Sequence, residues 1–187
     1  MWGSFVYYAD YDVLAFAWLY QGGLLVSAYY HATQAIEKYL KALALSIIDP
    51  LGKTHPYPAN RRWLQDHDLA RIANRCMKHF PYYGTTQVQA ILKRFSEFDQ
   101  LARYPWVQQD LGNGFTGADV PVICELLLHL RSDIPLVKDD YPLGMFIRGH
   151  HHQHPEYAVN PNLANMQGPA ITAARRMIPQ IDKMVRW

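Results

Sequence analysis

Apolar side chains recur along much of the chain at steps of three and four residues, the period of an amphipathic helix. The clearest run lies between residues 24 and 48. Its apolar members are Leu25, Tyr29, Ala32, Ile36, Leu40, Leu43 and Ile47. The pattern predicts a helix over residues 24–48, which ends before Pro50 because proline disfavours the helical conformation of the residue that precedes it.

Further helices are predicted on both sides of this one. Residues 10–20 are apolar on nearly all sides, and the short turn over 21–23 makes them an antiparallel neighbour of the helix over 24–48. Other apolar stripes predict helices over 67–79, 85–102 and about 119–134, and no segment alternates as a strand would. The predicted fold class is therefore all-α: an antiparallel up-and-down bundle of four to five helices over 8–138, with a C-terminal arm.

The predicted arm, residues 139–187, differs from the bundle in composition. Residues 139–169 are rich in Pro, Gly, His and Asn. A short amphipathic helix follows, although Pro179 would kink or split it. One side carries Ile171, Ala174, Ile178, Ile181 and Val185, and the other carries Arg175, Arg176, Lys183 and Arg186. We interpret this segment as an arm that packs on the bundle or on a second subunit.

Composition narrows the class of protein. The chain has 187 residues, of which 50% are hydrophobic and 18% charged, so it can form a packed core and is not a disordered chain. A net charge of +2 argues against a protein that binds duplex DNA with its whole surface. Any contact with nucleic acid must therefore be a local patch. Cys76 and Cys124 are read as buried thiols in a reducing cytosol. We interpret the uncharged run over 13–30 as two helices and expect a cytoplasmic protein without membrane contact.

Residues 30–42, YHATQAIEKYLKA, resemble the hallmark helix of HEPN domains, which reads Gln-Ala-x-Glu-Lys, an apolar pair and Lys-Ala. Two more elements are similar to the family's in the same order: HDL at 67–69 and ARYP at 102–105. The resemblance covers about residues 8–135. It implies a helical bundle that pairs into a homodimer and is associated with RNA, nucleotides or a cognate partner protein of a toxin–antitoxin system.

The active members of this family are metal-independent endoribonucleases, whose signature is an Arg followed four to six residues later by a His. There the His serves as general acid or base toward the ribose 2′-hydroxyl, and the Arg stabilises the phosphorane charge. No His follows Arg103 within that reach. The spacing occurs from Arg62 to His67 and from Arg148 to His154, neither at the family's position. Arg103, His67 and His154 are thus weak catalytic candidates.

The polar side of the helix over 24–48 is the candidate binding site, either as a solvated surface or as the floor of a cleft for an anionic ligand. Its residues are His31, Gln34, Lys38 and Lys41. Arg103 and Tyr104, at the end of another helix, could approach such a cleft. The lysines would contact phosphate, and the Gln34 amide would donate or accept a hydrogen bond.

Two other groups of residues are candidates, one for a metal site and one for stacking with bases. His150, His151, His152 and His154 lie on one loop with only Glu156 as a nearby carboxylate, so we expect no physiological metal site and no cofactor. Aromatic residues crowd the N-terminus and could stack bases, but their spacing favours a core or a dimer interface. They are Trp2, Tyr7, Tyr8, Tyr11, Trp18 and Tyr20.

The prediction from sequence is a homodimeric HEPN-type protein that binds a nucleotide or RNA, or an antitoxin-like partner, without robust catalysis. One alternative is a metal-independent endoribonuclease of the toxin type. The absence of a His after Arg103 is the feature that favours the binding protein over this alternative. A second alternative is a structural protein-interaction module in which the lysines of the helix bind nothing.

Overall fold

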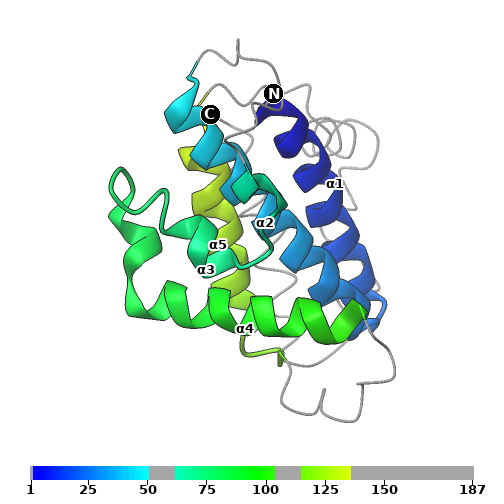
Figure 1. Ribbon diagram of the computed structural model, residues 1–187. Helices are drawn as coiled ribbons and strands as arrows, with labels where there is room; N and C mark the ends of the chain where they lie inside the picture. The colour runs from blue at the N-terminus through cyan, green and yellow to red at the C-terminus, as the bar shows by residue number, and fades with distance from the viewer. Residues whose placement is uncertain (1, 51–61, 104–114, 136–187) are drawn as a thin grey trace.

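The computed structural model describes residues 2–50, 62–103 and 115–135, with only the backbone of 99–103 (Figure 1). Within these ranges the chain forms five α-helices, two short 3-10 helices and no strand, which confirms the all-α bundle. The elements are α1 (Trp2–Gln21), α2 (Leu25–Ile48), η1 (Arg62–Gln65), α3 (Leu69–Ala73), η2 (Pro81–Gly84), α4 (Thr86–Arg103) and α5 (Val120–Asp133).

The turn between α1 and α2 reverses the chain as its glycines predict. Gly23 has a φ of 75°, a left-handed conformation that an L side chain disfavours. Its amide donates to the Tyr20 carbonyl at 3.1 Å, and the Leu24 amide donates to the Leu19 carbonyl at 2.9 Å. These two bonds form a Schellman motif, which satisfies carbonyls at the end of α1. The two helices then pack side by side (Figure 1).

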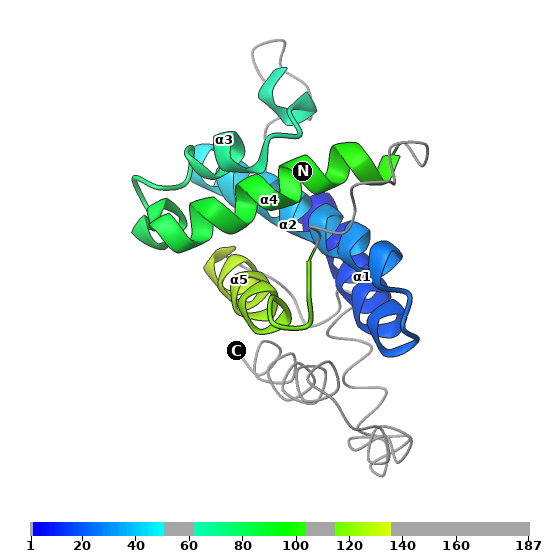
Figure 2. The same cartoon turned by 90° about the horizontal axis from the view of Figure 1, so that it is seen from below.

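Helix α2 is the centre of the bundle. It packs against α1, α3, α4 and α5, and Figure 2 shows it between α1 and the other helices. Most of its side chains are buried, including Tyr29, Ile36, Tyr39 and Leu40. In Figure 1, α4 runs crosswise to α1, α2 and α5. A helix covered on several sides has little surface left for polar residues, and this decides the character of the site described below.

The bounds of two predicted helices were wrong. Helix α1 begins at Trp2 rather than at residue 10, because Trp2, Val6 and Ala9 continue its buried side toward the N-terminus. The bundle therefore also begins before residue 8. The helix predicted over 67–79 is α-helical only over Leu69–Ala73. Beyond Ala73 the backbone continues in tighter turns, in which the Cys76 amide donates to the Ala73 carbonyl at 2.8 Å.

The helices α2, α4 and α5 lie within one residue of their predicted ends. The predicted arm over 139–187 lies outside the described residues. Among the helices that the structure describes, none combines the length and the apolar character needed to cross a membrane.

Candidate functional site

The first half of the predicted binding face is tied to α1. The His31 Nδ1 atom lies 2.9 Å from Asp12 Oδ1, and Lys38 Nζ donates to Asp12 Oδ2 at 2.5 Å. Asp12 is largely buried, whereas His31 and Lys38 are partly exposed. One carboxylate of α1 thus holds two candidate ligand-binding side chains of α2. The charge of Lys38 is already compensated, which weakens its attraction for a phosphate.

The second half of that face is buried, contrary to the solvated side expected from the helical period. Lys41 Nζ donates to Glu37 Oε1 at 2.6 Å, and these side chains are only 4% and 8% exposed. Helix α2 packs against α1, α3, α4 and α5, and so its polar side is not left to solvent along its whole length. Lys41 is therefore half of a buried ion pair. Gln34 is partly buried on the same helix.

The buried Glu37 also orients a histidine that faces solvent. Its Oε2 atom lies 3.0 Å from His67 Nδ1, and the His67 side chain is 53% exposed. A carboxylate beside Nδ1 favours the tautomer in which Nδ1 carries the proton and Nε2 keeps its lone pair. The arrangement leaves His67 Nε2 able to accept a proton or a hydrogen bond from a ligand.

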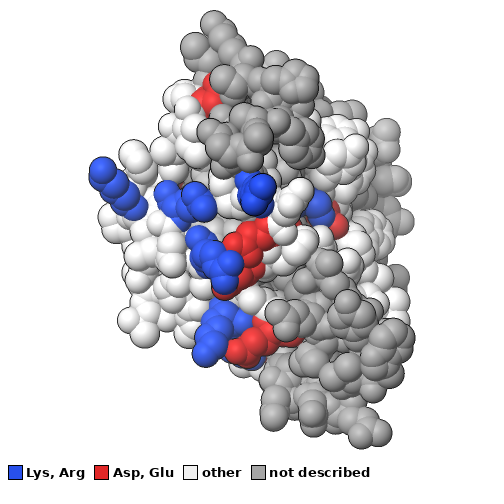
Figure 3. Space-filling model, in the orientation of Figure 1, with Lys and Arg blue, Asp and Glu red and all other residues white. Residues whose placement is uncertain are grey.

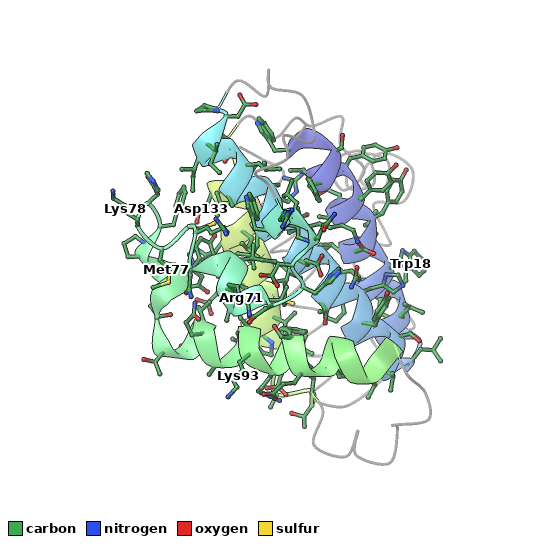
Figure 4. The ribbon with its side chains drawn as sticks, viewed as in Figure 1. Trp18, Arg71, Met77, Lys78, Lys93 and Asp133 are labelled. Carbon is green, nitrogen blue, oxygen red and sulfur yellow. The ribbon has the colours of Figure 1, made fainter. Side chains whose placement is uncertain are left out.

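His67 lies in a stretch of the chain that also carries exposed arginines and a tryptophan, and we call the group the arginine face. It consists of Arg62, Trp63, His67, Arg71 and Arg75. The Arg75 guanidinium lies over the Trp63 ring, 4.8 Å from its centroid. Figure 3 shows Lys and Arg gathered on this side of the molecule with acidic residues between them, and Figure 4 shows Arg71 on α3.

The charges of the arginine face are only partly compensated. Arg71 contacts Asp66 at 3.1 Å and Asp68 at 3.5 Å, although its own side chain stays largely exposed. Arg62 and Arg75 are exposed, and no carboxylate of the described residues lies within 4 Å of either. An anionic ligand would therefore find uncompensated guanidinium groups here rather than along α2.

Sequence reasoning singled out His67, but not Trp63, Arg71 and Arg75, as a candidate site residue. The basic run at 61–63 was a visible signal, whereas the contact of Arg75 with Trp63 depends on how the turns after α3 fold back. Three predicted site residues are not placed by the structure. The side chain of Arg103 at the end of α4, Tyr104 and His154 all lie outside what it describes.

A second polar cluster, wholly buried, joins three helices. Arg131 of α5 donates to both carboxylate oxygens of Asp10 of α1, at 3.0 and 3.1 Å, and the Tyr39 hydroxyl of α2 donates to Asp10 at 2.5 Å. Burial and the charge of Asp10 raise the pKa of Tyr39 well above its usual value. Burial lowers the pKa of Arg131, but Asp10 and Tyr39 outweigh it and raise that pKa. This cluster is closed to ligands and holds the helices in register.

The described residues offer neither a metal site nor a reactive thiol. No group of three His, Cys, Asp or Glu side chains among them converges as metal ligands. The histidines at 150–154 lie outside the described residues. Burial raises the pKa of Cys76 and of Cys124 to about 12, so neither is a thiolate near neutral pH.

Fold and site together define an all-α helical protein with an oriented histidine among exposed arginines. No protein-family model, curated protein or solved structure matches this chain. The resemblance to HEPN domains stays a prediction, which rests on the sequence motifs at 30–42, 67–69 and 102–105.

Proposed function

We propose that this protein is a HEPN-type module, homodimeric in solution, that binds single-stranded RNA or a nucleotide through its arginine face without robust catalysis. The observation that carries the proposal is the exposed His67, which contacts the buried Glu37 and lies in the same stretch of chain as the exposed Arg62 and Arg75. Guanidinium groups bind phosphate oxygens in bidentate fashion. The Arg75–Trp63 stack adds a flat surface next to which a base can lie.

The proposal moves the anion contact away from the residues that the sequence favoured. Lys38 and Lys41 each lie within 3 Å of a carboxylate, so a phosphate would have to compete with an existing ion pair. Among the described residues, no carboxylate would have to be exchanged at Arg62 or Arg75. The contact of the arginine face with nucleic acid is local, in keeping with a net charge of only +2.

Fluorescence anisotropy with a labelled single-stranded RNA tests this proposal. Arg75→Ala is expected to raise Kd about tenfold, which is about 1.4 kcal/mol. It should also lower the slope of log Kd against log salt by about 0.7, the value for one phosphate contact on a single strand. Lys93→Ala is the matched control, because it removes one exposed charge from α4, away from Arg71 in Figure 4. Equal losses in both variants would contradict a specific site.

The geometry of His67 also favours a second candidate, the metal-independent endoribonuclease. With Nδ1 held by Glu37, Nε2 could take the proton of a ribose 2′-hydroxyl while Arg62, five positions earlier in sequence, stabilises the phosphorane charge. The test is RNA cleavage in EDTA by the wild type, His67→Ala and Glu37→Gln. Cleavage lost in His67→Ala and reduced in Glu37→Gln would make the protein a nuclease. No cleavage by the folded wild type would leave binding as its function.

A further inference from the structure

Helix α1 presents aromatic side chains to solvent along most of its length. Tyr7, Tyr8, Tyr11 and Trp18 are 39%, 60%, 50% and 58% exposed, and we call them the aromatic face of α1. The Tyr7 ring packs edge-on against those of Tyr8 and Tyr11, with centroids 5.5 and 5.2 Å apart. In Figure 4 the Trp18 side chain projects at the edge of the molecule.

The aromatic face exposes a large area of apolar surface. If each aromatic side chain contributes about 200 Å², the exposed fractions correspond to roughly 400 Å² of largely apolar surface. Patches of that size on soluble proteins commonly mark a binding surface. Helix α1 contains no Lys or Arg, and among the described elements it packs mainly against α2. The aromatic face therefore keeps exposed apolar surface that contact with an apolar segment would bury.

We propose that residues 171–185 of this same chain bind the aromatic face of α1. The first argument is where the described chain ends. Arg131, near the end of α5, binds Asp10 of α1, and Asp10 lies within one helical turn of Tyr7 and Tyr11. The Arg131 side chain thus ties the last turn of α5 to the N-terminal half of α1, four residues before the described chain ends at residue 135.

The second argument is reach and shape. Thirty-five residues, 136–170, separate the end of α5 from the segment, and a flexible chain of that length spans about 33 Å. The apolar positions from Ile171 to Val185 would extend about 21 Å in a helix, and the aromatic face from Tyr7 to Trp18 extends about 16 Å. Pro179 disfavours an isolated helix, so this stripe needs a surface to pack against.

The third argument is charge. The other side of the segment carries three cations, and α1 has no cation to repel them. Arginine side chains at the margin of the contact can lie over tyrosine rings, which favours this face over one lined by aliphatic residues. The cations of the segment are Arg175, Arg176 and Lys183.

Hydroxyl-radical footprinting of the full chain, analysed by mass spectrometry, tests the proposal. The double variant Ile178→Asp/Ile181→Asp is expected to increase the modification of Tyr8 and Tyr11 at least threefold. Gln180→Asp adds a charge at a polar position and should leave their modification unchanged. The buried Tyr83 reports on the bundle and should be protected in all three chains. Equal modification of Tyr8 and Tyr11 in all three would overturn the proposal.

A second measurement covers the case in which the double variant fails to fold. The full chain with Tyr8→Cys and Ile178→Cys is oxidised at low micromolar concentration, and an intramolecular disulfide is expected. The chain with Tyr8→Cys and Gln180→Cys should form it much more slowly. Equal rates, or a disulfide only between two chains, would overturn the proposal. Protection of the face that grows with protein concentration would instead identify a second copy as the occupant.

Discussion

Replacing Arg131 by Met should destabilise the protein severely. The change keeps much of the side-chain volume but removes the cation that contacts both carboxylate oxygens of Asp10. Asp10 is 0% exposed and Arg131 is 5% exposed, so water cannot take the place of the lost partner. Removing one partner of a buried ion pair typically costs about 3–5 kcal/mol. Since a domain of this size is stable by about 5–15 kcal/mol, Arg131→Met should lose a large part of its stability.

The double variant Asp10→Asn/Arg131→Met separates the loss of a contact from the penalty of an unpaired charge. Asn removes the charge but keeps an oxygen that accepts from the Tyr39 hydroxyl. The double variant should therefore be more stable than Arg131→Met alone. The two changes should couple by about 2 kcal/mol or more, because each single change leaves the other group without its partner.

Urea unfolding followed by far-UV circular dichroism measures these free energies. Arg131→Met should lower the midpoint without changing the m-value, since the surface exposed on unfolding stays the same. A loss below about 1 kcal/mol, or additive effects in the double variant, would refute the reasoning. Such a result would mean that solvent reaches the carboxylate or that another residue neutralises it.

Three further predictions concern the turn after α1, the two buried thiols and the buried Lys41–Glu37 ion pair. Gly23→Ala should lower the free energy of unfolding by about 1 kcal/mol, because Gly23 has a φ of 75°. Gly22→Ala is the control: its new Cβ meets only ordinary contacts, so it should be nearly neutral in the same urea titration. Burial raises the pKa of Cys76 and of Cys124 to about 12, so the buried thiols should lower the free energy of unfolding only above pH 9, where thiols of the unfolded chain ionise. From pH 9 toward 12 the free energy of unfolding should fall by about 1.4 kcal/mol per pH unit for each thiol. Urea midpoints at pH 8 and 10.5 measure this fall, and a flat profile would contradict it. Lys41→Met should cost about 3 kcal/mol in thermal or urea unfolding, because it leaves a buried carboxylate without its cation, and a change below 1 kcal/mol would show that the pair is solvated.

The sequence by itself determined that the fold is all-α and located three of its helices. The apolar period located α2, α4 and α5 to within one residue, because burial of one side of a helix leaves a repeat of three and four in the chain. The Gly22–Gly23 pair located the reversal between α1 and α2, because a left-handed residue at a helix end is best met by glycine. These are local properties, which depend on neighbours in sequence.

Tertiary structure alone decided which polar residues stay accessible. The helical period placed Lys41 on the polar side of α2 but could not show that Lys41 and Glu37 are buried there. The contact between Asp10 and Arg131 joins residues 121 positions apart, and neither residue carries a local sign of the other. His67 became a candidate of a different kind once Glu37, buried 30 positions earlier, was seen to orient it. Helix periodicity reports which side of a helix is apolar, whereas only packing decides which carboxylate compensates each cation.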